Sequence, residues 1–154
     1  MVKFFSLSSG SNGNCYYIGN ERRGFLIDAG IGPRTVKKRL MEHGIDIEDI
    51  AFILVSHDHI DHIKGLGILA EKYSKPVYAT ATLHASLDNH PCTRYRSKGC
   101  VRKAPAGETS VYEDIRFTPF IVPHDATETV GYHIEIEDKK FTFLTDLGEV
   151  TDEV

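Results

Sequence analysis

A dense cluster of histidines and acids, directly after an apolar stretch, constrains this chain more than any other feature. Residues 51–62 read Ala-Phe-Ile-Leu-Val-Ser-His-Asp-His-Ile-Asp-His, and the apolar half is typical of a buried strand. His57 and His59 stand two residues apart, so an extended backbone directs both side chains to one side. Asp61 and His62 are adjacent, so their side chains diverge and can serve a second ion. Because zinc, manganese and iron accept imidazole and carboxylate ligands, the stretch predicts a metal site.

Three other β-rich runs also end in a residue that could act in such a site: Asp28, His124 and Asp146. Strand ends hold functional groups rigidly. We expect His124 to complete the ligands of the first ion and Asp146 to bridge to the second. Asp28 is expected to orient a histidine or the loop backbone, and Asp58 to support the ligands or act as a weak acid or base. The candidate metal ligands are therefore His57, His59, Asp61, His62, His124 and Asp146.

The remaining histidines and the cysteines give no comparable pattern. Four histidines are interpreted as ordinary core or surface residues: His43, His84, His90 and His133. Cys92 and Cys100 lie near two of them in sequence, but the spacings match no standard zinc module, so ordinary thiols are favoured over a second zinc site. The odd count of cysteines, 3 in all, argues against a disulfide framework.

Length and composition set the broad class of the protein. The 154 residues, 41% of them hydrophobic, are enough for one domain with its own core. The net charge of −4 does not indicate nucleic-acid binding, although bound cations would reverse the local sign in a pocket. No apolar run approaches the roughly 20 residues that span a bilayer, and the short apolar start is not a signal peptide. We therefore expect a cytoplasmic protein without a membrane partner.

Local patterns in the first third of the chain predict strands around a loop and then a helix. The small residues at 8–14 form a loop that reads as a turn or, alternatively, as a source of backbone N–H groups for an anion. A helix is expected over 33–43, because proline suits its first turn and glycine follows its end. Val36, Leu40 and Met41 would form the apolar stripe of this helix.

Later patterns predict two more helices and then a β-rich region. In a helix expected up to residue 73, Gly65 and Gly67 suggest close packing against residues 56–62, which we call the metal loop. Thr80 or Thr82 could cap the next helix. From residue 109 the chain reads as strands, and Pro119 implies that its strand lies at an edge or contains a bulge.

A basic segment at 93–103 differs in character from the rest of the chain. It carries five cations and no acid: Arg94, Arg96, Lys98, Arg102 and Lys103. One interpretation is an exposed loop. The other is a surface that contacts phosphates, with Tyr95 able to stack on a base. The sequence favours neither interpretation over the other.

Taken together, the motifs resemble those of the metallo-β-lactamase-fold hydrolases. The matching segments occur in the order of that family: 26–30, 56–62, His124 and 145–148. The resemblance implies an αββα four-layer sandwich of the α/β class, with two metal ions at one edge of the paired sheets. It also implies a further helix–strand unit and a final histidine ligand beyond the last motif. Residues 1–154 are therefore expected to form a single domain that is incomplete at its C-terminus, and that is unstable alone or associates with another copy.

Three further segments, 7–15, 76–80 and 122–126, resemble the YycJ/WalJ branch of that superfamily. This branch implies a DNA exonuclease with 5′-to-3′ polarity on double-stranded ends. Two divalent ions would make hydroxide available from water and neutralise charge on a phosphoryl or carbonyl oxygen. Asp61 would orient the hydroxide, and either His124 or the final histidine that the resemblance implies would assist the leaving group. Zinc is the default ion on the count of histidines, and manganese fits the same ligands.

Other functions are weighed against DNA hydrolysis. A thioester or lactone hydrolase of the glyoxalase II type would use the same ions on a carbonyl group. A secreted β-lactamase is disfavoured because no signal peptide is seen and because Asp146 stands where those enzymes carry a cysteine. A di-iron redox role is disfavoured because such relatives have a carboxylate at the position of His59. A non-catalytic metal-binding or regulatory protein is the alternative from another class.

Overall fold

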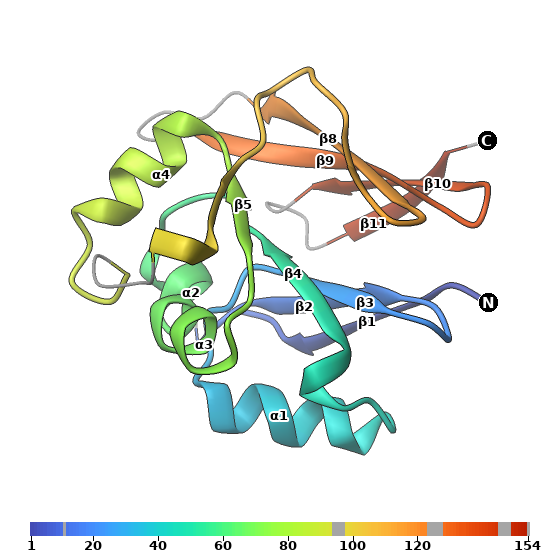
Figure 1. The fold of residues 1–154 in the computed structure, drawn as a ribbon, viewed down its shortest axis with the longest axis horizontal. Helices are drawn as coiled ribbons and strands as arrows, with labels where there is room; N and C mark the ends of the chain where they lie inside the picture. Colours follow the sequence, from blue (N-terminus) through green and yellow to red (C-terminus); the bar gives the residue numbers. More distant parts are fainter. Residues whose placement is uncertain (11, 94–97, 123–127, 145–148, 154) are drawn as a thin grey trace.

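The fold is built from two β-sheets that face each other, with helices on the outer side of the first sheet (Figure 1). The computed structural model describes residues 1–10, 12–93, 98–122, 128–144 and 149–153. The first sheet has the strand order β1-β2-β3-β4-β5-β6. Its strands are β1 (Lys3–Ser8), β2 (Cys15–Gly19), β3 (Gly24–Ile27), β4 (Ile50–Leu54), β5 (Val77–Ala79) and β6 (Val101–Lys103). The strands from β3 to β6 are parallel, and β1, β2 and β3 pair antiparallel.

The second sheet is antiparallel throughout, in the order β11-β10-β9-β8-β7. Its strands are β7 (Ser110–Tyr112), β8 (Ile115–Val122), β9 (Thr129–Ile136), β10 (Lys139–Leu144) and β11 (Glu149–Glu153). The helices are α1 (Pro33–Glu42), α2 (Ile60–Ile63), α3 (Leu66–Tyr73) and α4 (Ala81–Asp88), with short 3-10 turns η1 (Ile47–Asp49) and η2 (Lys98–Cys100). The predicted α/β sandwich is thus confirmed, and the described residues supply both sheets and one helical layer (Figure 1). None of these helices could cross a membrane.

Aromatic side chains fill the space between the two sheets. Phe52 of β4 stacks on Phe25 of β3 at 4.7 Å between ring centroids and lies 5.2 Å from Phe117 of β8. Tyr16 of β2 meets Phe143 of β10 edge-on at 5.2 Å. All five side chains are buried. Because such pairs remove large apolar areas from water, they hold the sheets together along their length.

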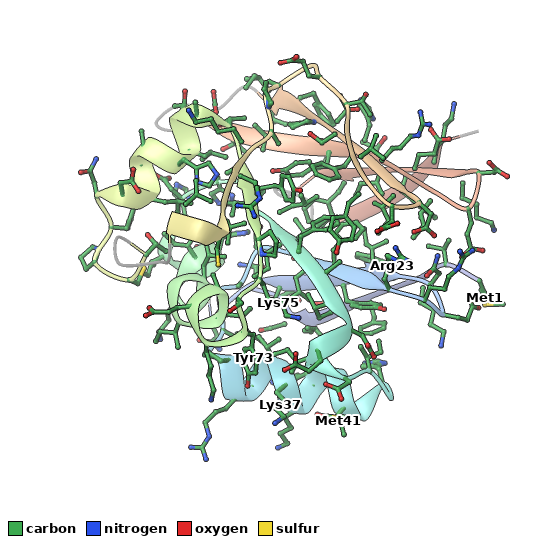
Figure 2. The ribbon with its side chains drawn as sticks, in the orientation of Figure 1. Met1, Arg23, Lys37, Met41, Tyr73 and Lys75 are labelled. Atoms are coloured by element: carbon green, nitrogen blue, oxygen red, sulfur yellow. The ribbon has the colours of Figure 1, made fainter. Side chains whose placement is uncertain are left out.

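Helix α1 packs with a narrower apolar stripe than the sequence suggests. Val36 and Leu40 are fully buried, as predicted, but Met41 is 58% exposed. Met41 lies about 140° around the helix from Val36, so it falls on the flank of the helix. Figure 2 shows Lys37 and Met41 projecting from α1 away from the sheets. The expectation for Met41 was therefore wrong.

The helix predicted up to residue 73 is divided into α2 and α3 at Lys64 and Gly65. The break coincides with a tertiary contact, because the Gly65 amide donates to the carbonyl of Ala29 at 2.8 Å. A Cβ atom at Gly65 would lie 1.9 Å from the carbonyl oxygen of Ile31. The glycine therefore marks close packing, as predicted, but against the chain after β3. Thr80 caps α4, accepting a hydrogen bond from the Leu83 amide at 3.2 Å.

Pro119 lies in β8, which has a neighbouring strand on each side. The prediction of an edge position holds only locally, because β7 pairs with β8 no further than Phe117. Beyond that point one side of β8 has no partner strand among the described residues, so the missing N–H of proline breaks no ladder bond there.

Two hydrogen bonds join the sheets directly at the point where β4 leads into the histidine cluster. The Tyr132 hydroxyl of β9 donates to the carbonyl of Val55 at 2.5 Å, and the Val130 amide donates to the carbonyl of Ser56 at 2.8 Å. Tyr132 is fully buried, and burial raises its pKa well above the ordinary value. The hydroxyl therefore remains a donor, and the second sheet fixes the start of the 55–59 loop.

Replacement of Tyr132 by Phe should destabilise the fold by about 1–3 kcal/mol, because the buried carbonyl of Val55 loses its donor. Chemical denaturation followed by circular dichroism measures this change. Tyr112→Phe is the matched control, since Tyr112 also packs on Phe52 in the core but no hydrogen bond of its hydroxyl is found among the described residues. Equal stability of Tyr132→Phe and Tyr112→Phe would show that the bond to Val55 contributes nothing.

Candidate metal centre

The candidate site lies where two parallel strands end side by side. Asp28 follows β3 and His57 follows β4, and the amide of Asp28 donates to the carbonyl of Leu54 at 2.8 Å. Helix α2 then carries Asp61 and His62 back over the same edge. In open α/β sheets, the carboxyl ends of parallel strands are the usual place for ligand sites. The fold therefore gathers the histidine cluster at the edge that the sequence predicts.

The side chain of Asp28 makes three hydrogen bonds within this region. It is completely buried and adopts a left-handed backbone conformation with φ of 64°, which aspartate tolerates better than most residues. Its Oδ1 accepts the Ser56 amide at 2.8 Å, and its Oδ2 accepts the Ser56 hydroxyl at 2.5 Å. Oδ2 also lies 2.7 Å from Nδ1 of His62. This last contact directs Nε2 of His62 outward from Asp28 and is the kind that orients a metal-ligating histidine.

The imidazoles and carboxylates of the cluster approach one another closely. Ligand atoms of Asp28, His57 and His62 all lie within 4.8 Å of one another. The ring of His57 is 3.8 Å from that of His62 and 4.5 Å from that of His59, centroid to centroid. Nε2 of His62 is 3.8 Å from Oδ2 of Asp61. Two ligands of one tetrahedral zinc ion are about 3.4 Å apart, so the 3.8 Å between Asp61 and His62 suits two ligands of one cation.

The protonation state of His57 suits a metal ligand. Burial, followed by the nearby His62, lowers the pKa of His57 to about 4. The ring therefore stays neutral at neutral pH and keeps a nitrogen lone pair for a cation. Asp28 is a less suitable ligand than the histidines, because its two oxygens already meet Ser56 and His62.

Asp58 makes a separate contact with Ser86 of α4 and with His90, which follows that helix. The carboxylate of Asp58 is buried and accepts a hydrogen bond from the Ser86 hydroxyl. Nε2 of His90 lies 3.8 Å from the same oxygen. Asp58 thus joins the metal loop to α4, as a supporting residue would, and His90 meets it although no sequence pattern connects the two.

Of the other residues singled out by sequence, some are described by the structure and some are not. His84 is buried with Nε2 2.6 Å from the carbonyl of Arg102, His43 stacks on Phe5, and His133 is exposed on β9. All three cysteines are free thiols. Some predicted site residues lie outside the described part of the chain: Arg94, Arg96, His124 and Asp146.

The basic segment is described only in part. Arg102 and Lys103 are exposed on β6, which forms one edge of the first sheet. The guanidinium of Arg102 donates to the carbonyls of Gly99 and Val101 at 2.7 and 3.0 Å. The side chain of Lys98 is outside the described set.

The contact of Asn14 with α2 was not predicted from the sequence. The amide of Asn14 donates to the carbonyl of Asp61 at 2.7 Å, and the amide of Gly30 donates to the carbonyl of Asn14 at 2.9 Å. A Cβ atom at Gly30 would lie 1.8 Å from the carbonyl oxygen of Asp61. The glycines around residues 13 and 30 were the one sequence feature that could have indicated this contact. They are needed because the backbone segments approach each other closely there.

Replacement of Asp28 by Asn should weaken zinc binding about 10–100-fold, because an amide NH2 cannot accept the His62 N–H. Asparagine also tolerates the left-handed backbone, so the fold should survive. Competition with a chromophoric chelator measures the affinity. Asp46→Asn is the control, since Asp46 caps η1 through Oδ1 and the amide oxygen can replace it. Unchanged zinc affinity in a folded Asp28→Asn variant would contradict the orienting role.

Comparison with known proteins gives the same architecture. The sequence profile of the β-lactamase superfamily domain matches residues 23–154. A metallo-β-lactamase from Cronobacter sakazakii superposes with a TM-score of 0.75 at 17% identity, covering 92% of this chain and 60% of that one. The Rm3 metallo-β-lactamase gives a TM-score of 0.72 at 19% identity, covering 90% and 56%. At these identities the structures establish the fold alone.

Two curated relatives are similar in sequence over nearly the whole chain. Exodeoxyribonuclease YycJ of Bacillus anthracis is 34% identical over 151 residues, which cover 98% of this chain and 56% of the relative. Exodeoxyribonuclease WalJ of Streptococcus pneumoniae is 34% identical over 150 residues, covering 97% and 56%. The chain thus spans about half the length of these relatives. With its sandwich and histidine cluster, the chain belongs to the metallo-β-lactamase-fold superfamily and is similar in sequence to members of its YycJ/WalJ branch.

Proposed function

We propose that this chain is part of a metal-dependent hydrolase that cleaves phosphodiester bonds in DNA. One observation carries the proposal: a cluster of histidines and carboxylates at a sheet edge, in a chain 34% identical to exodeoxyribonucleases. A 5′-to-3′ direction of digestion from duplex ends is the finer part of the proposal. The names of the relatives support DNA as the substrate. The histidine and carboxylate side chains support metal-dependent hydrolysis as the reaction.

The residues present fit two divalent cations, with zinc as the first candidate. His57 and His59 would hold one ion together with His124, and Asp61 and His62 would hold the other. Asp146 is proposed to bridge them. Imidazole nitrogen with carboxylate oxygen is a donor set that zinc and manganese both accept. When bound, such ions lower the pKa of a coordinated water and neutralise charge on a phosphoryl oxygen.

The protein's own groups would orient the reactants. Asp28 keeps the Nδ1 proton of His62 in place, so that Nε2 faces Asp61. The carboxylate of Asp61 would accept a hydrogen bond from the attacking water and direct its lone pair toward phosphorus. His124 is proposed to assist the departure of the leaving group. This division of roles makes His59 a ligand only, so its loss should abolish turnover without altering the fold.

Hydrolysis of duplex DNA should depend on the cluster. With manganese or zinc supplied, the wild-type chain should shorten 3′-labelled duplexes from the 5′ end, and His59→Ala should lose at least about 100-fold in rate. His133→Ala is the control, because His133 is an exposed histidine on β9. Activity that survives His59→Ala would show that another site is responsible. Hydrolysis of a glutathione thioester or a lactone with intact DNA would contradict the proposed substrate.

The exposed cations of β6, which belong to the 93–103 segment, are proposed to contact the DNA backbone. Arg102→Glu with Lys103→Glu should weaken duplex binding and reduce the slope of log K against log salt by about 0.9 for each phosphate that is no longer neutralised. Fluorescence anisotropy over a series of salt concentrations measures both quantities. Lys139→Glu with Lys140→Glu, an exposed pair at the β9–β10 turn, controls for net charge. An equal effect of both double variants would show that the β6 cations make no specific contact with DNA.

A further inference from the structure

The side chain of Asn14 links the 8–14 loop to the metal loop through an unusually complete set of hydrogen bonds. Asn14 is 7% exposed. Its Nδ2 donates to Oδ2 of Asp61 at 3.1 Å and lies 3.3 Å from the backbone carbonyl of the same residue. It also lies 3.0 Å from the carbonyl of Gly10. Residues 47 positions apart in sequence are therefore joined by one buried amide.

Neighbouring donors fix which end of this amide faces Asp61. The amide of Gly10 donates to Oδ1 of Asn14 at 3.1 Å, and the hydroxyl of Tyr16 donates to the same oxygen at 3.3 Å. A backbone N–H can only donate, so the atom facing Gly10 N must be the oxygen. Nδ2 must then face Asp61. Burial raises the pKa of Tyr16, which keeps its hydroxyl protonated and able to donate.

Asp61 needs such a partner because its own surroundings are open. Its side chain is 32% exposed, and it lies in a helix of only 4 residues. Among the described residues, Asn14 supplies the one hydrogen bond to its carboxylate. The oxygen that Asn14 holds is the one that lies 3.8 Å from Nε2 of His62. Without this bond the carboxylate could rotate among its staggered conformations, and only one of these faces His62.

We propose that Asn14 is a positioning residue that holds the Asp61 carboxylate in the orientation required to share a cation with His62. The inference rests on the proposed metal site and deepens it. An amide supplies both requirements at once, a donor for Asp61 and an acceptor for Gly10 and Tyr16. Aspartate would turn a second carboxylate toward Asp61, and serine or alanine would leave the gap unfilled.

The surrounding backbone supports a dedicated role for this contact. Gly13 has a φ of 140°, and a Cβ atom there would lie 2.5 Å from the carbonyl oxygen of Gly30. The amide of Asn14 also donates to the carbonyl of Asp61 at 2.7 Å. The loop is thus pressed against both the turn after β3 and α2, which keeps the Asn14 amide within reach of the carboxylate.

The test is zinc affinity of the full chain carrying Asn14→Ala, measured by competition with a chromophoric chelator that resolves successive ions. We expect the ion held by Asp61 to bind about 10–100-fold more weakly, and cobalt loaded in its place to show a changed visible absorption spectrum. Asn20→Ala is the matched control. Asn20 is 8% exposed and donates to Oδ2 of Asp114 at 3.2 Å while accepting the amides of Arg22 and Arg23. It should lose stability without losing zinc.

Two further variants keep the inference falsifiable. Tyr16→Phe removes one hydrogen bond to Oδ1 while keeping the amide, so it should weaken zinc binding in the same direction but less than Asn14→Ala; it serves as the deciding variant if Asn14→Ala does not fold. His62→Ala tests the proposed site itself. If His62→Ala loses zinc while folded Asn14→Ala, or Tyr16→Phe in its place, binds normally, the positioning role is wrong and the site stands. If His62→Ala also binds normally, the proposed site is wrong.

Discussion

The rest of the site depends on the hydrogen bonds that the buried carboxylate of Asp28 accepts. It ends β3 in a left-handed conformation and bonds both to Ser56, at the end of β4, and to His62, on α2. A buried carboxylate is costly unless its oxygens are satisfied. Here the donors that satisfy it belong to the metal loop. The carboxylate can therefore stay buried only while the loop keeps its conformation. Local strain of this kind is common at functional sites.

The two sheets contribute differently to this arrangement. The parallel strands β3 and β4 bring Asp28 and His57 to one edge, whereas the antiparallel second sheet anchors the loop from above through Tyr132 and Val130. On the other side, the backbone of Asn14 is hydrogen-bonded to Asp61 of α2. Backbone groups and buried side chains therefore fix the histidine cluster from three directions. A metal site needs such rigid support so that its ligands are already in place when the ion binds.

Much of this fold and part of the site follow from sequence, for identifiable reasons. The 51–62 stretch predicts both a strand and a ligand cluster because its pattern is local, and Asp28 stands out because it ends an apolar run. The role of Asn14 could not be predicted, because its partner Asp61 is 47 residues away and only the folded chain joins them. The helix break at Gly65 and the exposure of Met41 also depend on tertiary packing, which overrides local periodicity.

We expect the cluster around His57 and His62 to bind metal. X-ray diffraction from zinc-loaded crystals, at wavelengths on both sides of the zinc absorption edge, would locate the bound ions. Anomalous density is expected about 2.0–2.2 Å from Nε2 of His62 and from the Asp61 carboxylate, with a second peak beside His57 and His59. Zinc bound elsewhere, for example at Cys92 and Cys100, with no anomalous density at His62, would contradict this expectation.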